Sequence, residues 1–363
     1  MLLHELSNKG LIREIPPWMP DNCMYLVLMG SEAYGVSSGD SDRDLYGYAI
    51  PPKHMVFPHM AGHIFGFGEH PAKPYNVWQK HHIRDGSTQY DLAIYSIIRY
   101  VQLVMDNNPN MVDSLFVSRR CILHSTPVAE LLRDKRDIFL HKGCWHKFKG
   151  YSYSQLAKAK GKGHKHLEAL VALEDEWEIP RETTLEEAKA AYRMFCNEER
   201  LTGSFSHFER IPGETLEEYC ELYEKMVQAS NRAERCKIHG WDTKFLYHVV
   251  RLMLECEQIL QEGTLVLDEK GRREQMKAIR RGEWSIEVVE DFFQRKERYL
   301  ENLYESSRLR YSPDSEAIKE LLLTCLEQHY GSLDACVVRE DEAVRALREV
   351  AEVIDRNRKV VDG

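Results

Sequence analysis

Residues 25–50 decide the fold, and they read Tyr-Leu-Val-Leu-Met-Gly-Ser-Glu-Ala-Tyr-Gly-Val-Ser-Ser-Gly-Asp-Ser-Asp-Arg-Asp-Leu-Tyr-Gly-Tyr-Ala-Ile. The apolar run over 25–29 predicts a buried strand that stops at Gly30. A short helical turn is expected to follow, with the hydroxyl of Ser31 as its N-cap. A loop of small and polar residues then leads into a second strand, predicted over 42–50.

Two aspartates share one face of this second strand. Asp42 and Asp44 stand two residues apart, so their Cα atoms lie about 6–7 Å from each other on the same side. Without a nearby lysine, the two carboxylates repel each other unless a cation lies between them, and Mg²⁺ takes such oxygen ligands together with phosphate oxygens. The backbone N–H groups of Gly30 and Ser31 suit an anion. An anion cradle beside a cation site is what nucleoside triphosphate chemistry requires.

The spacing of these motifs resembles that of a known superfamily. A Gly-Ser pair followed, after a gap of about ten residues, by Asp-x-Asp resembles the signature of the DNA polymerase β-like nucleotidyltransferases. The fuller string Gly-Ser-x-Ala-Tyr-Gly with Ser-Asp-x-Asp resembles a narrower branch, the predicted nucleotidyltransferases associated with RNA ligases and RNA repair. We therefore expect an α+β catalytic core with a mixed sheet over residues 1–140 and a mostly helical domain over 141–363. An ordinary hairpin with a solvated acidic edge is the alternative for either motif alone.

A third carboxylate is expected at Asp91. It stands alone among apolar and aromatic residues on a strand predicted over 89–95, where an ionised carboxylate is costly unless it is paired or bound to a cation. The superfamily resemblance implies that a carboxylate from a neighbouring strand completes the metal site and takes the proton from the attacking hydroxyl. Asp85 and Glu69 are the alternative candidates. The segment around them, 51–85, is rich in His, Pro and Gly and is predicted to form loops and short strands, with no regular zinc-ligand spacing.

Length, charge and cysteine content set the broad class. The chain has 363 residues, a net charge of −9 and nine cysteines without a Cys-x-x-Cys pair. The negative net charge excludes nonspecific binding of nucleic acid over the whole protein surface, so any polyanion site needs a local basic patch. The scattered cysteines indicate reduced thiols, and no apolar stretch approaches the roughly 20 residues that span a membrane. A cytoplasmic protein is expected.

The basic segment 142–166 contains seven lysines without an intervening acid, together with Trp145, Tyr151 and Tyr153. Basic residues interleaved with aromatics can grip a phosphate backbone and stack on bases. Lys158 of this segment is expected to contact the phosphates of an incoming nucleotide. A solvated, lysine-rich helix face is the alternative.

The second half, 167–356, is predicted to be almost wholly helical, with a loop over 203–213 and Ser285 as the N-cap of a later helix. Within it, Lys244, His248 and Arg251 are spaced by four and three, so they share one helical face and suit an anion such as a triphosphate. Pairing of each cation with a neighbouring Glu is the alternative.

Further strings also resemble the RNA-repair branch, including those over 148–156 and 278–285, and two of them carry candidate residues. One contains Lys244, His248 and Arg251. The other is Asn-Pro-Asn-Met-Val-Asp-Ser-Leu-Phe over 108–116, in which Asp113 occupies a position where the branch is expected to have Glu. No catalytic role is assigned to Asp113, which could as easily cap or brace a helix.

The expected reaction is transfer of a nucleoside monophosphate from an NTP, ATP or CTP, to a hydroxyl, with release of pyrophosphate. Asp42, Asp44 and Asp91 would hold two Mg²⁺ ions, for which Mn²⁺ could substitute, and Gly30 and Ser31 would hold the triphosphate. The branch resemblance implies an RNA 3′ end, for example of a tRNA under repair, as the acceptor. A small molecule or a protein hydroxyl is the alternative acceptor. A module that binds NTP without chemistry is the alternative of another class.

Overall fold

The computed structural model is an α+β fold built on a mixed sheet, which confirms the predicted fold class. It describes residues 1–37, 42–63, 75–159, 165–229 and 233–333, together with residues 336, 347, 350 and 351. The five strands are ordered β3-β4-β2-β1-β5. Their bounds are β1 Cys23–Leu28, β2 Arg43–Ala49, β3 Val77–Asp85, β4 Thr88–Ser96 and β5 Ile122–Ser125. Only β2 and β4 pair in parallel, and the other pairs are antiparallel.

The strands predicted over 25–29, 42–50 and 89–95 correspond to β1, β2 and β4. Two local details differ from the predictions. The N-cap of the helical turn α2 (Gly30–Ala33) is Met29, two residues before the expected Ser31, and no side-chain hydrogen bond caps the turn. The segment 51–85 contains the nine-residue strand β3, whose side chains are mostly exposed and therefore lack the apolar pattern of a core strand.

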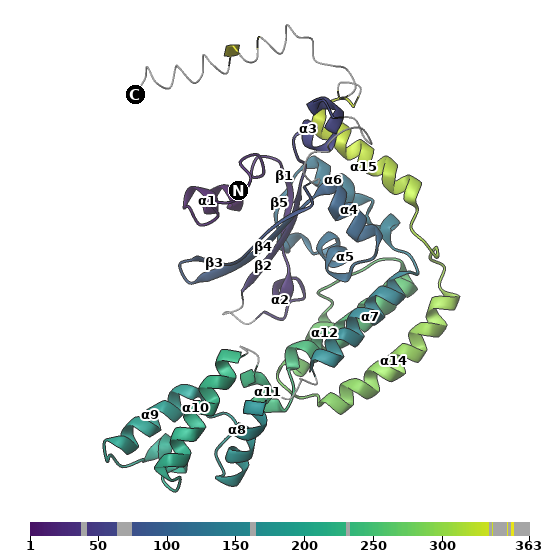
Figure 1. The fold of residues 1–363 in the computed structure, drawn as a ribbon. Coiled ribbons are helices and arrows are strands. Elements are labelled where there is room, and N and C mark those ends of the chain that lie inside the picture. The colour runs from purple at the N-terminus through teal and green to yellow at the C-terminus, as the bar shows by residue number, and fades with distance from the viewer. Residues whose placement is uncertain are drawn as a thin grey trace.

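Different elements cover the two faces of the sheet (Figure 1). One face packs on α1 (Leu2–Asn8) and on apolar residues of the following segment. The other face packs on α4 (Ile97–Met105), α5 (Pro109–Phe116) and α6 (Pro127–Asp134). The short elements of this part of the chain are the helix α3 (Lys53–Val56) and the 3-10 turns η1 (Pro58–Ala61), η2 (Arg119–Cys121) and η3 (Arg136–Phe139).

The hydrophobic core on the second face of the sheet extends without interruption into a layer of long helices. These helices are α7 (Cys144–Ala159), α12 (Thr243–Glu262), α13 (Lys270–Arg280), α14 (Ile286–Ser306) and α15 (Ser315–Tyr330). The helix α12 packs along both α7 and α14 (Figure 1). Ser285 accepts a hydrogen bond from the Val288 N–H at the start of α14, as predicted. The proposed division at residue 140 therefore does not coincide with a boundary between hydrophobic cores.

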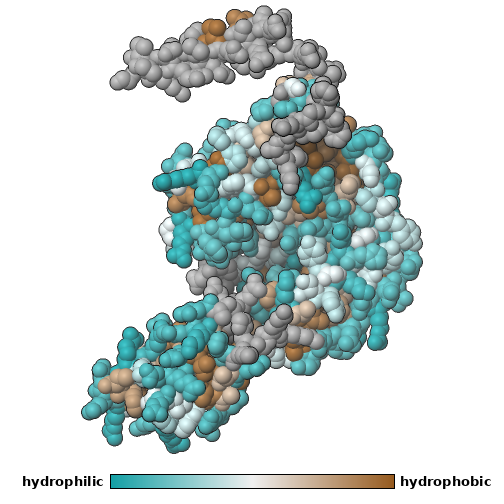
Figure 2. Space-filling model, viewed as in Figure 1, coloured by the Kyte–Doolittle hydropathy of each residue, from teal (hydrophilic) through white to brown (hydrophobic). Residues whose placement is uncertain are grey.

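A helical unit with its own core projects from this body. It consists of α8 (Lys165–Glu176), α9 (Leu185–Cys196), the 3-10 turn η4 (Gly203–Phe208), α10 (Gly213–Ala229) and α11 (Ala233–His239). Inside it, the buried Glu174 accepts hydrogen bonds from Lys237 at 2.9 Å and Tyr219 at 2.7 Å. Figure 2 shows this unit as a separate, mostly hydrophilic lobe. In the described part of the chain, no helix has the length and apolarity to cross a membrane.

Candidate active site

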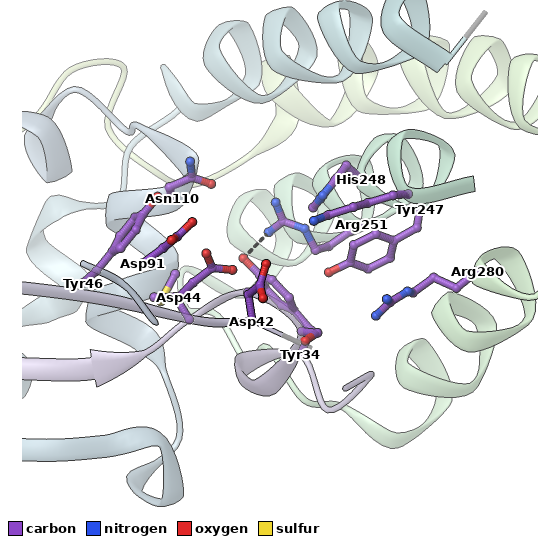
Figure 3. Close-up of a pocket in the computed structure, with 14 residues that line it drawn as sticks. Tyr34, Asp42, Asp44, Tyr46, Asp91, Asn110, Tyr247, His248, Arg251 and Arg280 are labelled. Carbon is purple, nitrogen blue, oxygen red and sulfur yellow. Dashed lines mark hydrogen bonds between the residues drawn. The ribbon is translucent and has the colours of Figure 1, made fainter. Parts of the chain in front are cut away.

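A pocket of about 430 Å³ opens where the sheet meets α12 and α13. All of the predicted site residues except Lys158 line it, and they come from α2, β2 and the residue before it, β4 and α12. In Figure 3 the carboxylates of Asp42, Asp44 and Asp91 lie on one side, and Tyr247, His248, Arg251 and Arg280 lie on the other. The pocket is thus acidic where the sheet forms it and basic where the helices form it.

Strand register brings two of the carboxylates together. Asp44 and Asp91 are direct partners across the parallel strands β2 and β4, and the exposed Asp42 immediately precedes β2. Burial raises the pKa of the Asp44 carboxyl; Lys244 opposes this shift, while the charges of Asp91 and Asp42 add to it. Within the described residues, no three His, Cys, Asp or Glu side chains already form a compact metal-binding group.

The backbone of β3 holds Asp91 in place. The irregular pairing between Lys80 and Ile83 gives His82 a positive φ of 56° and directs its N–H to the Oδ1 atom of Asp91 at 2.7 Å. The Oδ2 atom of Asp91 lies 3.3 Å from the His81 Nδ1 atom.

The two alternatives to Asp91 have different positions. Asp85 pairs with Lys9 at 2.6 Å and does not line the pocket. Glu69 lies outside the described residues.

The turn after β1 requires glycine at position 30. Its φ is +59°, and a Cβ atom added there would lie 2.2 Å from the Asp44 Oδ2 atom. Any other residue would be both strained in the left-handed region and in collision with the carboxylate. The close approach therefore fixes the Gly-Ser turn directly against the acidic side of the pocket.

Arg251 is part of a buried network. Its Nη1 atom donates hydrogen bonds to Tyr34 at 2.8 Å and to Glu255 at 2.9 Å, and it also pairs with Asp113. The Tyr34 hydroxyl donates to the same Asp113 carboxyl at 2.6 Å. Burial raises the pKa of Asp113 and raises that of Glu255 to about 8, although the Arg251 charge lowers both. Arg251 thus borders the pocket with its charge already shared with buried carboxyls, and Asp113 braces α5 against α12.

Two other cations face the pocket without such compensation. Lys244 is exposed at the start of α12, and Arg280 reaches the pocket from the end of α13, where its Nη1 donates to the Val36 carbonyl at 2.8 Å. Within the ranges that the structure describes, neither forms an ion pair with a carboxylate. Burial, and then the charges of Arg251 and Lys244, hold the pKa of His248 well below its usual value, so this side chain is neutral at pH 7.

The basic segment is divided between structural and exposed lysines. Lys142 is buried and donates to the Glu305 carbonyl at 3.1 Å, and Lys149 pairs with Glu297 at 2.6 Å. Lys158 is exposed, with its Nζ atom 6.0 Å from the centre of the Phe245 ring, and lies beside the pocket without lining it. Lys160 and Lys162 lie outside the described residues.

The pocket thus combines paired aspartates on adjacent strands, a Gly-Ser turn against them and cations on the opposite wall. Residues 12–171 match the family RlaP, described as the RNA repair pathway DNA polymerase beta family. This match confirms the resemblance drawn from the sequence motifs.

Among solved structures, the chain is similar to a nucleotidyltransferase-like protein from Exiguobacterium sibiricum 255-15, with 11% identity and a TM-score of 0.23. The alignment covers 81% of this chain and 90% of that one. No curated protein matches the chain significantly.

Proposed function

We propose that this protein is a metal-dependent nucleotidyltransferase that transfers a nucleoside monophosphate from an NTP to the 3′ hydroxyl of an RNA. The observation that carries this proposal is the pairing of Asp44 with Asp91 across β2 and β4, opposite Lys244 and Arg280 in one pocket. Carboxylates on one wall suit a cation, and cations on the other wall suit a polyphosphate. The match to an RNA repair family supports RNA as the acceptor.

The donor set on the acidic wall fits Mg²⁺, with Mn²⁺ as a substitute. Asp42, Asp44 and Asp91 supply only oxygen atoms, which hard divalent cations prefer. Burial raises the pKa of Asp44, and the negative charges of Asp91 and Asp42 add to this shift; a bound cation would relieve the repulsion among the three carboxylates. When bound, two such ions supply stabilisation of the attacking and leaving oxygens.

The residues of the chain have distinct roles in this proposal. Asp91, fixed by the His82 N–H, would accept the proton of the attacking hydroxyl. Gly30 and Ser31 would approach the triphosphate through their backbone, and Lys244 and Arg280 would neutralise its charge.

The buried and neutral residues would act differently. Arg251 would mainly hold α12 in position, because its charge is already shared with Asp113 and Glu255. His248 would line the pocket as a neutral imidazole that can donate or accept a hydrogen bond.

The test is incubation of the protein with each α-labelled NTP, Mg²⁺ or Mn²⁺ and a deproteinised RNA pool, while label and pyrophosphate are followed. Labelled RNA with pyrophosphate release is the expected result, and ATP or CTP is the expected donor. Pyrophosphate without labelled RNA would move the acceptor to a small molecule or a protein. NTP binding without any release would replace catalysis with nucleotide sensing.

A further inference from the structure

One exposed face of α7 carries lysines and an aromatic residue in line. Its buried side chains, among them Trp145, Phe148 and Leu156, face the core shared with α12. Beside this buried face, spacings of four, three and four place Lys147, Tyr151, Ser154 and Lys158 along one exposed stripe. At 1.5 Å per residue this α7 stripe is about 16 Å long.

The α7 stripe borders the pocket near its middle. The Tyr151 hydroxyl accepts a hydrogen bond at 3.0 Å from the side chain of Asn108, the N-cap of α5. Asn110, two residues further along, lines the pocket. Tyr151 also lies near enough to Tyr46, another lining residue, to influence its ionisation. The aromatic member of the stripe is therefore held beside the acidic wall of the pocket.

The α7 stripe reaches the pocket a second time at its C-terminal end. The Lys158 Nζ atom lies over the Phe245 ring at 6.0 Å, and Phe245 follows the pocket-lining Lys244 on α12. Because α7 and α12 pack side by side (Figure 1), the stripe runs along the margin of the pocket between these two contacts.

The charges of the stripe are available to a ligand. Lys142, just before α7, and Lys149, elsewhere on α7, form internal contacts. In the part of the chain that the structure describes, Lys147 and Lys158 form no ion pair with a carboxylate. The helical unit α8–α11, in contrast, has more acidic than basic side chains among its described residues and would repel a polyanion.

We propose that the α7 stripe binds the single-stranded 3′ segment of the acceptor RNA and leads its end into the pocket. This inference rests on the proposed function. A base stacks on Tyr151 next to the acidic wall, and Lys147 and Lys158 neutralise backbone phosphates on either side of it. Stacking on an exposed tyrosine combined with lysine–phosphate contacts is the usual physical basis of single-strand binding.

The test measures binding of a 5′-fluorescent single-stranded RNA of 12 nucleotides by anisotropy at several salt concentrations. Lys147→Ala and Lys158→Ala are each expected to reduce the slope of log K against log salt by about 0.7, the contribution of one phosphate contact. Tyr151→Leu is expected to weaken binding at least about fivefold, whereas Tyr151→Phe, which keeps the ring, should weaken it much less.

The same helix offers a matched control. Tyr153 is more exposed than Tyr151, at 67% against 38%, but stands on the other edge of the exposed face. Tyr153→Leu should leave RNA affinity unchanged, as should Lys225→Ala on α10. Equal losses for Tyr151→Leu and Tyr153→Leu, or an unchanged salt slope in both lysine variants, would overturn the inference.

A separate readout keeps the two proposals apart. Wild-type pyrophosphate release with RNA tests the proposed function. If release and RNA labelling occur while the stripe variants bind RNA like the wild type, the proposed reaction is supported and the proposed RNA-binding role of the α7 stripe is wrong. If the wild-type protein binds no single-stranded RNA, the stripe is wrong whatever the reaction.

Discussion

Gly30 and Asp44 show how closely the Gly-Ser turn and the carboxylates depend on each other. The Asp44 carboxylate occupies the space where a side chain at position 30 would begin. A motif that reads as two separate sequence signals, Gly-Ser and Asp-x-Asp, is therefore a single packed unit.

Gly30→Ala tests this unit. A non-glycine residue in the left-handed region costs about 1–2 kcal/mol, and the added Cβ must also displace Asp44. We expect pyrophosphate release to fall about 100-fold or more, because small misplacements of catalytic groups have effects of that size. Gly86→Ala is the control: Gly86 has a similar φ of +62°, and nothing lies within 4 Å of its added Cβ. If both variants retained full activity, Gly30 would have no positioning role.

The protonation of Glu255 predicts a pH dependence of stability. Its pKa is raised from 4.5 to about 8 in the folded protein, mainly by burial. Between these two values the unfolded chain loses the proton while the folded protein keeps it, so this group lowers the free energy of unfolding as pH rises, by at most about 1.4 kcal/mol per pH unit.

Glu255→Gln should remove this decline, so the variant should have nearly the stability of the wild type near pH 4.5 and become more stable than the wild type as the pH rises toward 8. Urea denaturation at several pH values measures it, with the exposed Glu262→Gln on the same helix as the control. A decline that is identical in Glu255→Gln and the wild type would contradict the assignment.

At the scale of elements, the sequence predicted the strands that carry the aspartates but not how they pair. Asp91 was found because a lone carboxylate on an apolar strand is costly without a partner. Its position opposite Asp44 follows from the parallel register of β2 and β4, which no local pattern encodes. Short strands were expected over 51–85, but the length and bounds of β3 were not predicted because most of its side chains are exposed.

The helix α12 shows a similar limit. Spacing correctly placed Lys244, His248 and Arg251 on one face, and all three line the pocket. Spacing could not show that Arg251 is buried against Asp113, which comes from a helix 138 residues away in sequence. Arg280 was missed because only the packing of α13 brings it to the pocket.

The link between α5 and α12 can be measured by a double-mutant cycle. Asp113→Ala leaves Arg251 with one buried carboxylate fewer and should cost about 3 kcal/mol or more. Once Arg251→Met has removed the cation, the same change should cost less, with a coupling energy of at least about 1 kcal/mol. Urea denaturation of the four proteins gives the cycle, and additive effects within about 0.5 kcal/mol would contradict the brace.

At the scale of the whole molecule, the sequence predicted a helical second half but not its division. The helices α7 and α12–α15 share a core with the sheet, whereas α8–α11 have a core of their own. Helical periodicity is the same in both groups, so only three-dimensional packing separates them.

Separate cores predict separate responses to a core mutation. Phe208 is fully buried in the helical unit, and Phe208→Ala should destabilise that unit by about 3–5 kcal/mol. Hydrogen exchange should rise in α8–α11 and remain unchanged in β1, β2 and β4. Faster exchange in the strands as well would show that the two cores unfold together.

The central claim is that the aspartates of the pocket perform nucleotidyl transfer. The most direct measurement compares pyrophosphate release from an NTP, with RNA and Mg²⁺, between the wild type and Asp42→Asn. Because Asp42 is exposed, the variant should keep the fold and the stability of the wild type. We predict that release falls at least about 100-fold. Release at the wild-type rate with an unchanged metal requirement would contradict the account.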